Sequence, residues 1–216
     1  EKIQTIKDGK MPIYEPGLPE LVKKNVDNGS LKFSTNLTLA VQESEVIFIC
    51  VGTPSNQSGA ADLSAVWSVA EEIGKAVNGY KVIVVKSTVP VGTNEEVEKI
   101  VNSVVAGRYE FDVVSCPEFL REGYSIEDSF NTDRVIIGGK NQKGIDKVKS
   151  IYSHLKTEIV ECDLRSAEMI KYASNAFLAT KISFINEIGQ VCERAGADVV
   201  NVARGMGLDK RIGKSF

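Results

Sequence analysis

The chain has 216 residues, of which 43% are hydrophobic and 25% are charged, and its formal net charge is -3. This length is enough for one large globular domain or one and a half. The small negative charge gives no electrostatic basis for binding nucleic acid or an anionic membrane, so neither is expected as a partner.

The cysteines and the single histidine show no spacing that would build a metal site or a disulfide framework. Cys50, Cys116, Cys162 and Cys192 form no C-x-x-C pair, and His154 is the only histidine. We therefore expect no metal ion, and the reducing cytoplasm is the default compartment. The N-terminal residues lack the apolar segment of a signal peptide.

The first elements in chain order follow a proline-punctuated loop at residues 11–18. They are a helix from Pro19 to about Asn28, a strand from Leu31 to Ser34, a helix capped by Asn36 and ending near Glu43, and an apolar strand at residues 46–51. An apolar run without alternation is typical of a strand buried on both faces, as in parallel sheets.

Helices and strands then alternate as far as residue 161. The predicted elements are a helix capped by Asp62 and ending near Val77, a strand at 81–86, a helix from the Thr93-x-x-Glu96 capping box to about Val105, strands at 112–115 and 134–138, a helix at 142–155 and a strand at 157–161. This alternation predicts an α/β fold, Rossmann-like, with a doubly wound parallel sheet and right-handed crossovers.

One long helix is predicted from Ser166 to Ala195, followed by a short helix that Asp198 caps and that ends near Arg204. Apolar residues of the long helix are not confined to one stripe, so we expect it to be covered on more than one side, as at a joint between domains or subunits. Its charged residues exclude a membrane span. We divide the chain into an α/β domain at 1–163 and the long helix with the start of a helical domain at 164–216.

Three turns follow apolar strands, and ligands of doubly wound sheets bind at the carboxyl ends of strands. Residues 51–55 are small, residues 86–93 place two hydroxyls before a helix N-terminus that could bind phosphate, and residues 116–123 place Glu118 and Glu122 at a strand end. For each turn the alternative is an ordinary connection without a ligand.

The long helix offers Lys171 and Asn175, which are four residues apart and share a face. A solvated helix lysine is the alternative for Lys171. No G-x-G-x-x-G motif follows a strand, and the nearest match, at residues 205–207, follows a helix and lacks the third glycine. The residues alone therefore indicate only an α/β ligand-binding protein.

Six strings of the sequence together resemble the UDP-glucose/GDP-mannose dehydrogenase family, in the order that the family has them. They are PIYEPGL at 12–18, VGTP at 51–54, STVPVGT at 87–93, PEFLREG at 117–123, EMIKYASNAF at 168–177 and DKRIG at 209–213. The resemblance covers essentially the whole chain. The EPGL loop and the RIG ending favour UDP-glucose as the substrate, and the GDP-mannose and UDP-N-acetylmannosamine dehydrogenases of the family are the alternatives.

The resemblance implies that the intact enzyme oxidises the primary alcohol of UDP-glucose to a carboxylate, giving UDP-glucuronate. Two hydride transfers to NAD would proceed through an aldehyde and a cysteine-bound thioester. Glu122 would lie beside the nicotinamide, and the other residues bordering NAD would be Val51, Gly52, Thr53, Pro54, Ser87 and Thr88.

The resemblance also assigns the catalytic residues as Glu118, Lys171, Asn175 and Thr88. Glu118 would act as acid and base, which suits a carboxylate that must activate water. Lys171 and Asn175 would hold the reacting oxygen, because a fixed cation stabilises an oxyanion strongly in a water-poor site. The residues implied for substrate binding are Glu118, Phe119, Leu120, Arg121, Glu122, Lys171, Asn175 and Arg211.

The resemblance implies that Arg211 reaches the sugar nucleotide of a neighbouring subunit, and its alternative is a solvated terminal arginine. It also implies a homodimer, or a larger homo-oligomer, through the 166–195 helix. The family's glycine-rich unit, about 30 residues, would precede residue 1, and its catalytic cysteine would follow residue 216. We therefore interpret the chain as a piece of the enzyme that is inactive by itself. The alternative is a non-catalytic module for nucleotide-sugar binding or dimerisation, which calorimetry and light scattering would separate from the first interpretation.

Overall fold

The computed structural model describes residues 2–214, and the outermost ends of the two expected domains, at residues 1 and 215–216, lie outside it. The chain forms two compact units, and the division falls between Lys171 and Tyr172. This division lies within a long helix, α8, which spans Leu164–Ala195.

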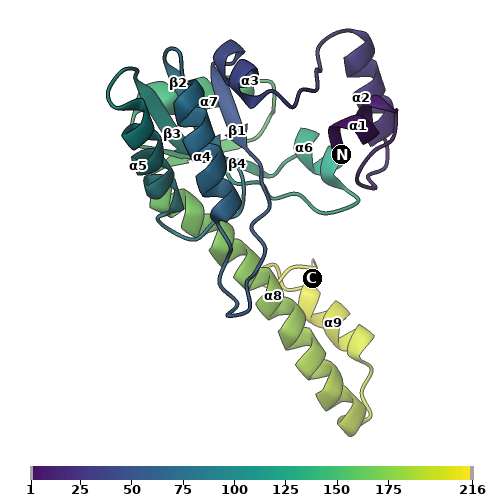
Figure 1. The fold of residues 1–216 in the computed structure, drawn as a ribbon. Helices are drawn as coiled ribbons and strands as arrows, with labels where there is room; N and C mark the ends of the chain where they lie inside the picture. Colours follow the sequence, from purple (N-terminus) through teal and green to yellow (C-terminus); the bar gives the residue numbers. More distant parts are fainter. Residues whose placement is uncertain (1, 215–216) are drawn as a thin grey trace. The chain divides into compact units, whose positions relative to one another are not determined.

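The first unit contains the α/β sheet that the sequence predicts (Figure 1). Its elements are α1 (Lys2–Lys7), α2 (Leu18–Asp27), α3 (Leu37–Glu43), β1 (Val46–Ile49), α4 (Ser64–Ala76), β2 (Lys81–Val85), α5 (Thr93–Val105), β3 (Phe111–Ser115), α6 (Ser125–Phe130), β4 (Arg134–Gly139), α7 (Gln142–Ile151), β5 (Glu158–Cys162) and the beginning of α8. The expected α/β class is confirmed.

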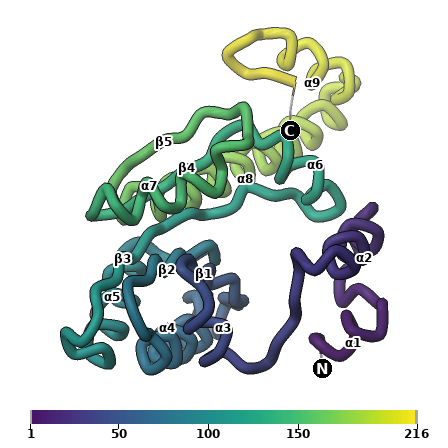
Figure 2. The backbone as a smooth tube through the Cα atoms, turned by 90° about the horizontal axis from the view of Figure 1, so that it is seen from above, coloured from purple at the N-terminus to yellow at the C-terminus, as the bar shows by residue number. Residues whose placement is uncertain are grey.

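The five strands form one sheet in the order β1-β2-β3-β4-β5, which Figure 2 shows from above. β1, β2 and β3 are parallel, and their last residues, Ile49, Val85 and Ser115, lie in register. The three turns that the sequence singles out therefore leave the sheet at one common edge, here called the carboxyl edge.

The prediction of a wholly parallel sheet is wrong at one pairing, because β4 runs antiparallel to β3. The connection between these strands, residues 116–133, contains only the six-residue helix α6. A parallel crossover is usually built around a helix that covers the sheet, whereas an antiparallel neighbour needs no such helix. Only two residue pairs join β3 to β4, so β4 begins beyond the carboxyl edge.

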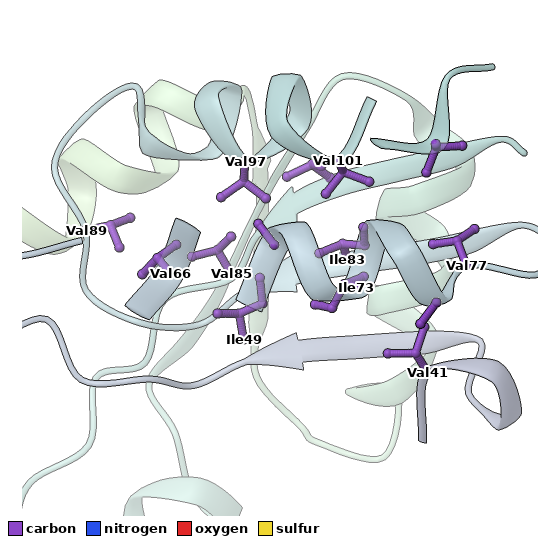
Figure 3. Packing of buried hydrophobic residues seen from close by; sticks show 14 residues of the cluster. Val41, Ile49, Val66, Ile73, Val77, Ile83, Val85, Val89, Val97 and Val101 are labelled. Atoms are coloured by element: carbon purple, nitrogen blue, oxygen red, sulfur yellow. The ribbon is translucent and has the colours of Figure 1, made fainter. Parts of the chain in front are cut away.

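Helices cover both faces of the sheet, as a doubly wound fold requires. Ile83 and Val85 of β2 belong to the cluster that contains the inner faces of α4 and α5, which Figure 3 shows. Val82 and Val84 belong to a second cluster, with Val148 of α7. Every residue of β2 is buried, because its alternating side chains supply both clusters.

Several local predictions of strands and helix caps are wrong. Residues 31–34 form no strand, since no described strand pairs with them. Leu63 rather than Asp62 is the N-cap of α4, although the Asp62 carboxylate accepts a hydrogen bond from the Ser64 N–H. The Thr93 hydroxyl donates to the Pro90 carbonyl, so the expected capping box is not formed. The sequence analysis also missed α1 and α6, which have only six residues each.

The second unit contains the rest of α8 and the helix α9, Val199–Gly207. α8 ends at Ala195, and Gly196 follows with a φ of 68°, which is the left-handed geometry expected at that position. The Asp198 carboxylate accepts a hydrogen bond from the Val200 N–H and so caps α9, as predicted. No helix among residues 2–214 is long and apolar enough to cross a membrane.

The start of α8 packs directly on β4 at Gly138. A β-carbon at Gly138 would lie 2.6 Å from the Ala167 β-carbon and 2.7 Å from the Asp163 carbonyl oxygen. We expect Gly138→Ala to lower the free energy of unfolding by about 1–3 kcal/mol, the cost of overpacking a tight core. Urea unfolding measures this effect. Gly79→Ala is the matched control, because no atom lies within 4 Å of its added β-carbon.

Candidate active site

The turns after β1 and β2 lie side by side at the carboxyl edge. The Ser87 hydroxyl donates to the Val51 carbonyl at 2.7 Å, and the Thr53 hydroxyl donates to the Thr88 carbonyl at 2.8 Å. These hydroxyls therefore hold the two turns together. Gly52 is exposed, and no atom lies within 4 Å of the place that a β-carbon would take, so the backbone there is open to a ligand.

Lys171 meets Glu118 in the third turn. The Lys171 Nζ lies 3.3 Å from the Glu118 Oε1, and the two side chains are 8% and 31% exposed. The second oxygen of this carboxylate accepts a hydrogen bond of 2.5 Å from the Leu120 N–H. The predicted alternative of a solvated lysine is wrong for Lys171, because burial forces its charge to find a partner.

Two cations lie close to the Phe119 ring. The Arg134 guanidinium is 4.1 Å from its centroid, and the Lys171 Nζ is 5.1 Å away. Arg134 begins β4, which starts beyond the carboxyl edge because of the antiparallel pairing. Phe119 therefore supplies a second contact that orients the buried amine. Sequence reasoning missed Arg134, since nothing near it in the chain indicates this contact.

The turn at residues 116–123, here called the acidic turn, is exposed at residues 120–122. An ion pair joins it to α6. The Arg121 guanidinium makes a two-pronged ion pair with Asp128, whose carboxyl pKa this hydrogen bonding lowers. Leu120 and Glu122 are exposed. Within residues 2–214, no hydrogen bond or ion pair joins Glu122 to Lys171. The structure thus brings Glu118 and Lys171 together, whereas Glu122 lies apart on the same turn.

A buried glutamate from the N-terminal loop braces the acidic turn. Glu15 is 7% exposed, and its carboxylate accepts hydrogen bonds from the N–H groups of Gly123 and Ser125 at 3.0 and 2.7 Å. The sequence analysis placed Glu15 in a motif but gave it no partner. A carboxylate followed by Pro-Gly carries no local signal for a contact more than a hundred residues away.

The N-terminus of α5 is not free to bind phosphate, which corrects the expectation for residues 86–93. The Glu168 carboxylate of α8 already accepts hydrogen bonds from the N–H groups of Gly92 and Asn94, at 2.6 and 2.8 Å. A carboxylate satisfies these donors and the positive end of the helix dipole. A bound phosphate would have to compete with it.

Asn175 and Arg211 belong to the second unit. Asn175 is exposed on α8, one turn after Lys171. Arg211 is paired with Asp209 at 2.7 Å and lines a cavity of about 880 Å³ between α8, α9 and residues 208–214, together with Phe177 and Phe184. The assignments of Asn175 and Arg211 to a substrate stay predictions.

Cys116 follows β3 but is not built as a nucleophile. It is 1% exposed, and burial raises the pKa of its thiol, which lies 3.7 Å from the Tyr152 hydroxyl. A reactive cysteine needs the opposite environment, because the thiolate is the nucleophile. In the described part of the chain, no group of three or more His, Cys, Asp or Glu side chains could hold a metal ion.

A mostly parallel sheet with helices on both faces and open, small-residue turns at its carboxyl edge is the arrangement of a Rossmann-like nucleotide-binding protein. Residues 1–156 match the model of the UDP-glucose/GDP-mannose dehydrogenase family, NAD binding domain, and residues 165–216 match that family's central domain. The chain belongs to this family, so the resemblance seen in the sequence is confirmed.

The relatives that the chain matches include proteins of several substrate classes. It is 53% identical to a UDP-glucose 6-dehydrogenase of Bacillus subtilis, over 100% of this chain and 47% of that protein. A UDP-glucose dehydrogenase structure from Pyrobaculum islandicum has 40% identity and a TM-score of 0.95, covering 98% of this chain and 50% of that one. A GDP-mannose dehydrogenase structure from Pseudomonas aeruginosa has 37% identity and a TM-score of 0.93, covering 96% and 49%.

The chain therefore spans about half the length of the curated relatives it matches. The match to the family's NAD binding domain confirms NAD as the expected cofactor. The residues present fit part of such a cofactor, because the turn at Gly52 leaves the backbone open beside the hydroxyl-linked turn that contains Ser87 and Thr88. The glycine-rich phosphate motif does not occur in this sequence.

Proposed function

We propose that the protein to which this chain belongs is an NAD-dependent UDP-glucose 6-dehydrogenase that oxidises UDP-glucose to UDP-glucuronate. The observation that carries the proposal is the buried Lys171 amine, 3.3 Å from the Glu118 carboxylate in the turn that follows β3. The identity of 53% to a UDP-glucose 6-dehydrogenase supports the choice of sugar nucleotide.

In this proposal NAD supplies the hydride acceptor, and the chain's own residues position the sugar and handle the proton. Lys171 donates to the reacting oxygen of the sugar and stabilises its developing negative charge. Glu118 takes the proton of the alcohol and later activates water. Because their ion pair is only partly exposed, the charge of each residue acts at short range on the other and on the substrate.

The remaining predicted residues take binding roles. Turns 51–54 and 87–88 border NAD, and Glu122 lies beside the nicotinamide. The residues assigned to the sugar nucleotide are Phe119, Leu120, Arg121, Asn175 and, from a neighbouring subunit, Arg211. We place the end of the cofactor domain near residue 163.

We also propose a homodimer through α8. Large apolar side chains of the second unit are exposed on α8 and α9, namely Phe177, Ile182, Phe184, Val191 and Val200. A second copy packed on these helices would remove this apolar surface from water. The cytoplasm is the proposed compartment, since all four cysteines are free thiols.

The test is a substrate panel on the full-length protein. We expect NADH to form with UDP-glucose, two per sugar, and at least tenfold more slowly with GDP-mannose or UDP-N-acetylmannosamine. Faster turnover of GDP-mannose would assign the protein to the GDP-mannose class, in line with its 37% identity to that enzyme. A protein that is dimeric by light scattering and ignores every substrate and NAD would be a binding or dimerisation module.

A further inference from the structure

Glu168 is the most deeply buried charged side chain among residues 2–214, and it has no role in the reaction proposed above. It is 2% exposed. Three donors point to its carboxylate: the Gly92 N–H at 2.6 Å, the Asn94 N–H at 2.8 Å and the Asn94 side-chain amide at 2.7 Å. A buried carboxylate needs such a set of donors, because an unpaired charge there would cost several kcal/mol.

The Glu168 carboxylate links two parts of the candidate site, namely the N-terminus of α5 and the part of α8 that contains Lys171. Its donors, Gly92 and Asn94, directly follow the turn that contains Ser87 and Thr88. On its own helix it stands three residues before Lys171, which is about 4.5 Å along the axis and on nearly the same face. The start of α8 is also pressed against β4, where Ala167 meets Gly138. Lys171 therefore sits on a helical turn that is held from two elements.

We propose that Glu168 is a positioning residue. Its carboxylate, on α8, accepts hydrogen bonds from the N-terminus of α5 and thereby fixes the position of the Lys171 amine relative to Glu118 and to the turn at residues 86–93. A shift of about 1 Å in a catalytic group is enough to slow a reaction by roughly 10²-fold. The part of this inference that concerns turnover rests on the proposed function, whereas the placement of the amine does not.

The matched control is an ion pair that joins the same two helices at the surface. The Arg165 guanidinium of α8 pairs with Glu95 of α5 at 2.7 Å, and both side chains are substantially exposed. Glu95→Gln removes this link without touching Glu168, and an exposed pair contributes little. Glu168→Gln keeps the shape of the side chain but places an amide nitrogen against a backbone or side-chain donor.

Two readouts on the full-length protein test the proposal. In Glu168→Gln we expect acetylation of Lys171, followed by mass spectrometry with Lys149 as the internal reference, to be at least tenfold faster. We also expect kcat with UDP-glucose to fall at least tenfold while the KM values for both substrates change less than threefold. Glu95→Gln should match the wild type in both readouts.

Unchanged labelling of Lys171 in folded Glu168→Gln overturns the proposal, whatever the activity. Faster labelling supports it even if the wild type does not oxidise UDP-glucose, and that inactivity would instead remove the proposed function. If Glu168→Gln does not fold, Asn94→Ala provides the same test, because it removes only one of the three donors. Asn94→Ala should shift both readouts in the same direction by a smaller factor. If Asn94→Ala leaves both readouts unchanged, the proposal is overturned.

Discussion

Replacing Lys171 with alanine is expected to lower kcat for NAD reduction with UDP-glucose by roughly 10²- to 10³-fold in the full-length protein. The lysine amine is buried and held by Glu118 and the Phe119 ring, so water cannot easily take its place. A positioned cation in such a site stabilises the developing oxyanion, and alanine removes this stabilisation from the transition state.

Steady-state NADH formation measures the effect, and the unfolding midpoint shows whether Lys171→Ala is folded. Lys149→Ala is the matched control, because it removes a lysine from a surface ion pair with Glu161 at 2.6 Å. We expect its turnover to stay within twofold of the wild type. A folded Lys171→Ala with normal kcat would remove the catalytic role of Lys171 and leave only its structural pairing.

Glu118→Gln is expected to lower kcat by roughly 10²- to 10⁴-fold, the usual contribution of a general acid or base. Glutamine can still accept the hydrogen bond from the Leu120 N–H, so the turn should keep its shape. It cannot take up a proton. We therefore expect the loss to appear in kcat, with the KM values for both substrates changed less than threefold.

Steady-state NADH formation by both proteins at neutral pH measures this difference. Glu127→Gln is the control, since Glu127 is an exposed carboxylate of nearby α6 and accepts a hydrogen bond only from Asn131 among the described side chains. A folded Glu118→Gln with normal kcat would show that another group handles the proton.

The two turns at residues 51–55 and 86–93 could largely be predicted, because the residues that mark them are neighbours in the sequence. Apolar runs such as residues 81–86 identify buried strands by themselves, and small residues after them identify an open turn. The contact between Thr53 and Thr88 then follows from the common edge at which parallel strands end.

The contacts that build the rest of the site carry no such signal. In the sequence, Glu168 looks like an ordinary charged residue of a helix and Glu15 like an ordinary residue of a loop. In the structure, each carboxylate is buried and accepts hydrogen bonds from backbone N–H groups more than seventy residues away. The capping box at Thr93 is absent for a local reason: Gly92 is the N-cap of α5, and the Thr93 hydroxyl donates to the Pro90 carbonyl.

The amino-acid sequence by itself determined the α/β class, the buried strands and the family, since these depend on periodicity and on short strings of residues. Only the tertiary structure decided that β4 runs antiparallel to β3, that Lys171 meets Glu118, and that Glu168 caps α5. The physical reason is that buried charges and neighbouring strands are paired by their proximity in the folded chain. Separation along the sequence does not reveal that proximity.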